Sequence, residues 1–453
     1  MEKERPEQRD ALFLHTFARH GFFCCRKKSM ILSDESILEI LHADTGMALG
    51  CTEPIAVALA VVKAREILGK TPVHVHLRVS GNIYKNARGV GIPGTDQRGL
   101  EVAAAMGCLT GSSDRALEVL EGVTDQIAAR AADFAAQGGV DISIAEEVDK
   151  LFIEATVRSD DGHTASATVE KHHTLITRAT HDGTVVWEKE ETPLYRQDEQ
   201  GNIEGMSVAR LYEFARSVDV ERLSDLARGA EANWRIADAG LKKRYGYCLG
   251  KILSAKSSSD SDLMRRSMAK VAAGIDARMS GSMLPVMTNS GSGNQGITIY
   301  VPVIEAALAA GSDTEQLLRA LAFANLVPIH IKHRIGPLSA LCGIVPASIG
   351  AACGIAFLRG ATLEQIENVI QLIIANISGL FCDGAKASCS MKASVGIAAA
   401  YEAMYMAVES GEKAQCEGIL DPDVEHSIGN LSRIAISAMD STDREIIDIM
   451  TCK

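Results

Sequence analysis

TASATVEKHHTLITRATHDGTVVW, residues 164–187, is the stretch that decides the fold class. Apolar and polar residues alternate along it with the period of two that is typical of β-strands. The tripeptide His181-Asp182-Gly183 interrupts the alternation and indicates a hairpin turn. Residues 73–79, VHVHLRV, alternate in the same way. We therefore predict a β-containing unit between about residues 71 and 195.

The sequence on both sides of this unit has helical patterns. Residues 33–47, SDESILEILHADTGM, begin with a capped helix start. Residues 51–69 indicate a second helix, with Pro54 in its first turn and Gly69 after its end. From about residue 205 onward the pattern is helical almost throughout. It is broken by glycine-rich loops, where we expect the chemistry to lie, at 288–296, 334–343 and 379–388.

The composition narrows the class of protein. The 453 residues are 47% hydrophobic but only 4% aromatic and include 39 glycines, which favours closely packed helices of small aliphatic side chains. The formal net charge of -12 argues against a nucleic-acid partner, because such proteins carry clustered Lys and Arg. The apolar run at 344–358 is shorter than the ~20 residues that cross a bilayer, so no membrane association is expected.

The ends and the cysteine content suggest where the protein works. Eleven cysteines without a secretion signal indicate a reducing compartment, and we expect a cytoplasmic protein. Residues 1–29 mix charge with short aromatic pieces, and Met30 starts the first well-patterned segment. Our hypothesis is that 1–29 are a leader outside the native protein, which native peptides from before Met30 would contradict.

Four cysteines stand beside glycine or other small residues, namely Cys342, Cys353, Cys382 and Cys389. Small neighbours let backbone and sulfur crowd around an inorganic cluster. The chain has neither the paired C-x₂₋₄-C knuckles of a zinc site nor a redox C-x-x-C motif. Free cysteines also pack as small hydrophobic residues, so the spacing alone leaves cluster and packing open.

A glycine-rich loop and a further cysteine are also candidates. The loop MTNSGSGNQGI, residues 287–297, could hold a carboxylate or phosphate on its backbone amides and on Asn289, Asn294 and Gln295, or could be a tight turn between helices. Its literal G-x-G-x-x-G lacks the βαβ context of a dinucleotide site. Cys51 precedes a helix start, which favours a thiolate, whereas Glu53 opposes ionisation.

Five motifs together resemble the L-cysteine desulfidase family, which is related to the α chain of iron-sulfur L-serine dehydratases. They occur in order between about Met30 and the end of the chain. They are GCTEP (50–54), GNIYKNARGVGIPGT (81–95), TNSGSGNQGI (288–297), LSALCG (338–343) and GLFCDGAKASCSMK (379–392).

The resemblance implies an oxygen-sensitive [4Fe-4S] cluster with one iron open to substrate, and no pyridoxal phosphate. Matched by motif, Cys342, Cys382 and Cys389 are the implied ligands, with Cys353 as the fallback for Cys342. Cys51 matches the family's active-site cysteine, which acts as an acid or base. The substrate's carboxylate and amino group are expected on the loop that contains Asn289, Ser290, Gly291, Asn294 and Gln295.

The implied reaction is that of a lyase, which eliminates sulfide from L-cysteine and gives pyruvate, ammonia and hydrogen sulfide. One alternative is dehydration of L-serine by the same chemistry, and another is a non-catalytic protein that binds or senses amino acids. The expected partner is a small-molecule amino-acid substrate, and association into a homo-oligomer is a further possibility.

The fold implied by the related dehydratases is α+β, with a mainly helical catalytic domain and a smaller inserted α/β domain. The predicted strands agree with it independently. We expect residues 30–70 plus 200–453 to form the helical iron-sulfur domain and residues 71–199 to form the α/β domain. Cys51 would then lie near the three cluster cysteines.

Overall fold

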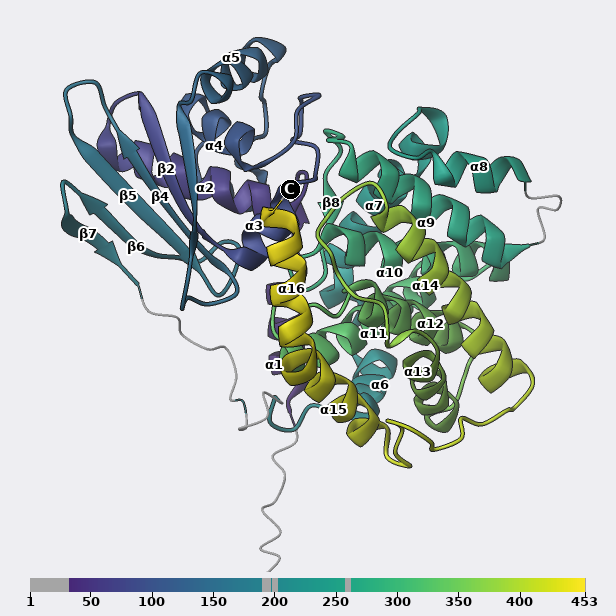
Figure 1. Cartoon of the computed structure of the whole chain (residues 1–453). Coiled ribbons are helices and arrows are strands. Elements are labelled where there is room, and N and C mark those ends of the chain that lie inside the picture. The colour runs from purple at the N-terminus through teal and green to yellow at the C-terminus, as the bar shows by residue number, and fades with distance from the viewer. Residues whose placement is uncertain (1–31, 190–196, 198–202, 257–261, 453) are drawn as a thin grey trace, which may run out of the picture.

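The computed structural model describes residues 32–189, 197, 203–256 and 262–452. The hypothesis about residues 1–29 lies outside these residues. The fold is α+β and mainly helical, as predicted, with a large helical domain beside a smaller α/β domain (Figure 1). Among the described helices, none combines the length and the apolar character needed to cross a membrane.

A six-stranded sheet forms the α/β domain, with strand order β3-β2-β4-β5-β6-β7. Only β2 and β3 are parallel, and the other neighbours are antiparallel. The predicted hairpin is confirmed, since Asp182 and Gly183 both have positive φ, 46° and 79°, as a two-residue primed turn requires. The strands are β2 (His74–Ser80), β3 (Val140–Ala145), β4 (Phe152–Arg158), β5 (Thr164–Glu170), β6 (Ile176–His181) and β7 (Thr184–Glu188).

One helix fills the space between this sheet and its other helices. The helix α2 contacts β4, β5, β6 and α4, and apolar residues are buried on all its sides. The predicted domain boundary at residue 70 therefore differs from the structure, because α2 belongs to the α/β core while α1 packs with the helical domain. The helices of this domain are α2 (Thr52–Leu68), α3 (Gly81–Ala87), α4 (Leu100–Leu109) and α5 (Asp125–Ala136), with a 3₁₀ turn at Ser113–Glu118.

The helical domain is built around α12, which contacts α10, α11, α13 and α14. Close approach depends on glycine there, because a Cβ on Gly350 would lie 2.3 Å from the carbonyl oxygen of Ala324 in α11. Its helices are α1 (Asp34–Asp44), α6 (Val208–Ser217), α7 (Ser224–Lys242), α8 (Leu249–Lys256), α9 (Leu263–Met279), α10 (Gly293–Ala310), α11 (Thr314–Ile335), α12 (Ile344–Leu358), α13 (Leu363–Ile377), α14 (Cys389–Met404), α15 (Val424–Arg433) and α16 (Met439–Thr451).

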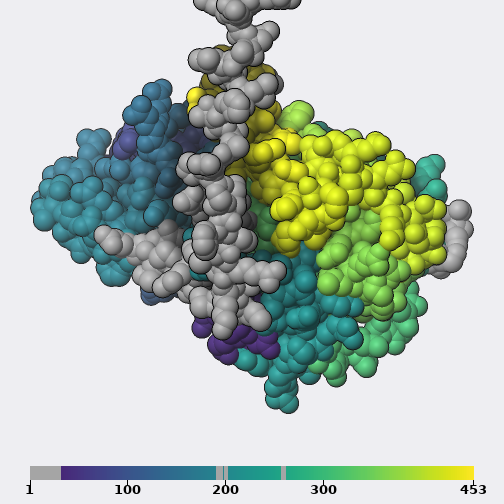
Figure 2. All heavy atoms as spheres, turned by 90° about the horizontal axis from the view of Figure 1, so that it is seen from below, coloured from purple at the N-terminus to yellow at the C-terminus, as the bar shows by residue number. Residues whose placement is uncertain are grey.

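Two features join the domains. Strand β1 (Met47–Ala48), which leads into α2, pairs antiparallel with β8 (Val286–Met287), which leads into the loop before α10. The C-terminal helix α16 lies beside α3 (Figure 1), and its Asp443 accepts hydrogen bonds from the buried side chains of Lys85 and Asn82. In Figure 2 the yellow C-terminal segment covers part of the helical domain, next to the blue α/β domain.

Replacing Asp443 with Asn is expected to destabilise the protein, because the buried Lys85 ammonium would lose its carboxylate. Breaking such a buried pair from one side typically costs about 3–5 kcal/mol. Asp440→Asn is the matched control, because its pair with Lys150 is partly exposed and such pairs contribute at most about 1 kcal/mol. Urea unfolding of the two variants measures the difference, and equal losses would contradict the role given to Asp443.

Candidate active site

A cleft lies where the two domains meet, and part of it is open to solvent. Its empty volume, open solvent included, is about 720 Å³. The α/β side contributes the start of α2 and Asn86 of α3. The helical side contributes Arg278 of α9, the start of α10, Lys332 of α11 and the loops before α12 and α14. The segments before α10, α12 and α14 are the three glycine-rich loops that the sequence predicted to carry the chemistry.

The three predicted ligand thiols, those of Cys342, Cys382 and Cys389, all line this cleft. Two of their loops are joined by backbone hydrogen bonds, from Cys342 N to the Leu380 oxygen (2.9 Å) and from Cys382 N to the Ala340 oxygen (2.6 Å). Cys389 begins α14, and its Sγ accepts a hydrogen bond from the Lys386 backbone N–H at 3.4 Å. The fold thus brings together sulfurs that are 47 positions apart at most in the sequence.

The arrangement does not suit a single metal ion. Within the described residues, no three His, Cys, Asp or Glu side chains converge closely enough to hold one ion. The thiols are nevertheless near enough for Cys382 to raise the pKa of both Cys342 and Cys389, in addition to the larger effect of burial. Cys353, the fallback ligand, is fully buried in the middle of α12 and does not line the cleft.

Four helices begin at the cleft: α2, α10, α12 and α14. Helix starts carry unpaired N–H groups and the positive end of the helix dipole. Ser292 caps α10 by accepting a hydrogen bond from Gln295 N, but α2, α12 and α14 have no side-chain cap. At the start of α14 the N–H groups of Cys389, Ser390 and Met391 already donate to backbone oxygens of the preceding turn. The positive ends of the four helix dipoles nevertheless favour anionic ligands in the cleft.

The thiol of Cys51 is hydrogen-bonded to a carboxylate. Its Sγ donates to Glu53 Oε2 at 3.2 Å, and Asn86 Nδ2 donates to Glu53 Oε1 at 3.1 Å. Burial raises the pKa of Cys51 well above its usual value, and the charge of Glu53 raises it further. Burial opposes ionisation of Glu53, but His173 and the Cys51 hydrogen bond leave its pKa lowered. At neutral pH Cys51 is therefore protonated and Glu53 carries the charge.

His173 reaches the site from the loop between β5 and β6 of the α/β domain. It is 7% exposed, and its Nε2 has no hydrogen-bond partner in the described structure. Burial lowers its pKa, while the charge of Glu53 raises it. The sequence pattern around adjacent His172 and His173 gave no sign of this, because the burial comes from the packing of the loop against the helical domain at Gly291.

The residues predicted to bind substrate divide into two groups. Asn294 and Gln295 line the cleft, together with Ser292, which the sequence did not single out. Asn289, Ser290 and Gly291 do not line it. Asn289 is fully buried and donates from Nδ2 to the backbone oxygen of Asn325 at 3.1 Å, so it holds the loop on α11.

The charged side chains that line the cleft are one carboxylate, Glu53, and three cations, Arg278, Lys332 and Lys392. Lys392 donates to Asp383 at 2.7 Å. Burial lowers the pKa of Lys332 to about 8, against the opposing effect of Cys382 and Cys342. No sequence signal marked Arg278.

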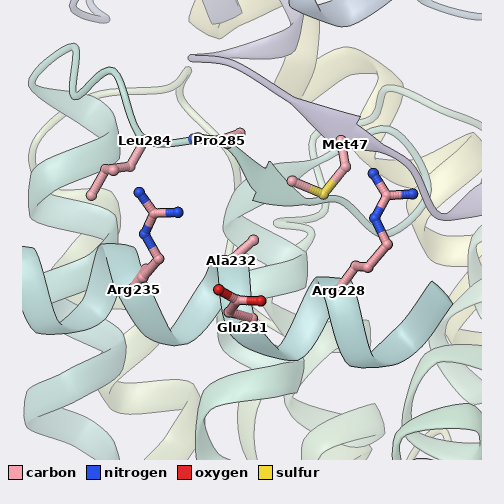
Figure 3. A pocket seen from close by; sticks show the side chains of 7 residues that line it. All are labelled: Met47, Arg228, Glu231, Ala232, Arg235, Leu284 and Pro285. Atoms are coloured by element: carbon pink, nitrogen blue, oxygen red, sulfur yellow. The ribbon is translucent and has the colours of Figure 1, made fainter. Parts of the chain in front are cut away.

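A second hollow lies against the β1–β8 ribbon, with an empty volume of about 500 Å³. Arg228 and Arg235 extend from α7 toward Met47 and the Leu284–Pro285 segment (Figure 3). Both arginines are exposed, and none of the predicted site residues lines this hollow. It is therefore separate from the candidate active site.

Replacing Glu53 with Gln is expected to lower the pKa of Cys51, because the charge and the hydrogen bond of the carboxylate both raise it. Alkylation by iodoacetamide at mildly alkaline pH should accelerate about three- to tenfold for each unit of that fall, because the thiolate fraction rises faster than the thiolate's nucleophilicity falls. Mass spectrometry of the Cys51 peptide measures the rate. The exposed Cys416 is the internal control and should react alike in both proteins. Equal Cys51 rates would contradict the pairing.

Comparison with known proteins agrees with the motifs. The family model of the serine dehydratase alpha chain matches residues 114–448. A UPF0597 protein of Oleidesulfovibrio alaskensis is 39% identical over 92% of this chain and 97% of its own length. UPF0597 proteins of Phocaeicola vulgatus and Aeromonas hydrophila are each 40% identical over 92% of this chain, covering 98% and 96% of those proteins. The chain belongs to the serine dehydratase alpha chain family.

Proposed function

We propose that the protein is a carbon-sulfur lyase that eliminates sulfide from L-cysteine with the help of a [4Fe-4S] cluster. The observation that carries the proposal is the meeting of Cys342, Cys382 and Cys389 with the Cys51–Glu53 pair in one cleft. Such a site combines a ligand set for the cluster with a group that can move protons.

The residues fit an iron-sulfur cluster better than a single ion. Three thiols from separate turns line one wall, and iron-sulfur clusters are held by cysteine thiolates. Lys332 and Lys392 line the same cleft and would balance the negative charge of the cluster, and the positive dipole ends of α12 and α14 would add to this effect. Cys342, Cys382 and Cys389 would hold the cluster, which leaves one iron without a protein thiol.

The chemistry of the cleft divides between the cluster and the chain. When bound, the cluster supplies an open iron that acts as a Lewis acid toward the substrate. The sulfur of Cys51 can take the α-proton once its own proton has moved to Glu53 across their 3.2 Å hydrogen bond, a transfer that the raised pKa of Cys51 opposes and the charge of Arg278 assists. Asn86 keeps the Glu53 carboxylate in place for this transfer.

The overall reaction balances without a redox partner. Loss of the α-proton to Cys51 and of hydrosulfide from the β-carbon forms the Cα–Cβ double bond of aminoacrylate. Protonation of the β-carbon gives the imine, and water then releases ammonia and pyruvate. Because burial makes the Cys51 thiol a weak acid, it is a poor proton donor to the leaving group. Sulfide elimination suits such a site, since hydrosulfide is a much weaker base than hydroxide and can leave as an anion.

A second candidate is dehydration of L-serine, which the name of the matching family favours. The same residues would act, with water leaving in place of hydrogen sulfide. Anaerobically purified, reconstituted protein should release sulfide from L-cysteine faster than pyruvate from L-serine. The reverse order would favour the dehydratase. A colourless, iron-free protein after reconstitution would favour a non-catalytic protein that binds amino acids.

Two variants should separate chemistry from cluster binding. Cys51→Ala is expected to keep its iron and to lose turnover by about 10²- to 10⁴-fold, the usual contribution of a positioned acid or base. Cys382→Ala should lose both iron and activity, because it removes a ligand. Iron content and sulfide release measure the contrast. The control is Cys353→Ala, which lies outside the cleft and should keep both. Normal turnover in Cys51→Ala would overturn the assigned role.

A further inference from the structure

Arg278 is a buried cation that is fixed in orientation by neutral groups. It lies in the last turn of α9, is 2% exposed and lines the cleft. One terminal nitrogen donates to Asn294 Oδ1 at 3.0 Å, and the other donates to the Gly50 oxygen at 2.8 Å. Each terminal nitrogen keeps a second N–H after these bonds.

This charge has no ion pair of its own among the residues that the structure describes. By the 4.0 Å limit for an ion pair, Arg278 has no carboxylate partner there, and its Nε has no acceptor. Glu53 is near enough for Arg278 to lower its pKa, but it already accepts hydrogen bonds from Cys51, Thr52 and Asn86. A buried cation without a pair is costly, so the site calls for an anion from outside the chain.

The cations of the cleft fall into two groups. Lys332 interacts electrostatically with Cys382 and Cys342, on the side of the thiols. Arg278 instead lowers the pKa of Cys51, on the side where α2 and α10 begin. The anionic cluster would engage the first group, which leaves Arg278 and two helix starts for a second anion.

We propose that Arg278 binds the α-carboxylate of the substrate and so selects α-amino acids for the reaction. The inference rests on the proposed function, but it concerns binding rather than elimination. Asn294 then acts as a positioning residue, since its Oδ1 holds the guanidinium. A carboxylate on Arg278 brings Cα toward Cys51, because Gly50, which also fixes Arg278, directly precedes that cysteine.

L-alanine provides the test, because it has the carboxylate and amino group but no leaving group. Its affinity for the full-length reconstituted protein is measured by calorimetry, with ethylamine as the probe that lacks the carboxylate. Wild type should bind L-alanine and not ethylamine. Arg278→Met should weaken L-alanine binding about 10- to 100-fold, the usual range for a charged hydrogen bond, and Arg278→Lys should restore part of it.

Arg266→Met is the matched control. It removes a guanidinium from the same helix, but this guanidinium pairs with Glu305 and lies outside the cleft. It should leave L-alanine affinity unchanged. Unchanged affinity in Arg278→Met, equal binding of ethylamine by wild type, or no binding of L-alanine by wild type would each overturn the inference. Arg278-dependent L-alanine binding in a protein that cleaves neither cysteine nor serine would keep the carboxylate site and reject the lyase.

Discussion

The convergence of four helix starts on one cleft is the constraint on which the site depends. Helices α2, α10, α12 and α14 direct their N-termini there, and three of them lack a side-chain cap. Positive helix ends that are brought together repel one another unless negative charge lies among them. The β1–β8 ribbon fixes the starts of α2 and α10, and the joined loops at Leu341 and Phe381 fix those of α12 and α14.

The two domains share this cleft, so their relative position is part of its chemistry. The α/β domain supplies Cys51, Glu53 and Asn86, and the helical domain supplies the three thiols and Arg278. The contact between α16 and α3 extends to the site itself, because Lys85, paired with Asp443, also donates to the Cys382 carbonyl at 3.3 Å. One buried lysine thus connects the C-terminal helix, the α/β domain and a predicted ligand.

The sequence predicted correctly the features that short stretches of residues determine by themselves. The alternation and the Asp182-Gly183 turn predicted the hairpin, and the motifs placed Cys51 and three other thiols in one family pattern. The domain of α2 was missed because a helix that is apolar on every side does not show which core it joins. Arg278 and His173 were missed because a single arginine or histidine forms no sequence motif. Only tertiary packing buries these two side chains.

The buried polar atoms left without partners indicate why the cleft needs a ligand. Within the described residues, nine buried side-chain atoms have no hydrogen bond, and three of them, on Asn86, Arg278 and Gln295, belong to residues that line the cleft. Each such atom typically costs about 1–3 kcal/mol. A core would remove this cost by apolar substitution, whereas a binding site keeps it until a polar ligand arrives. The other six atoms lie outside the cleft, so a substrate offsets this cost only where its polar atoms reach Asn86, Arg278 or Gln295.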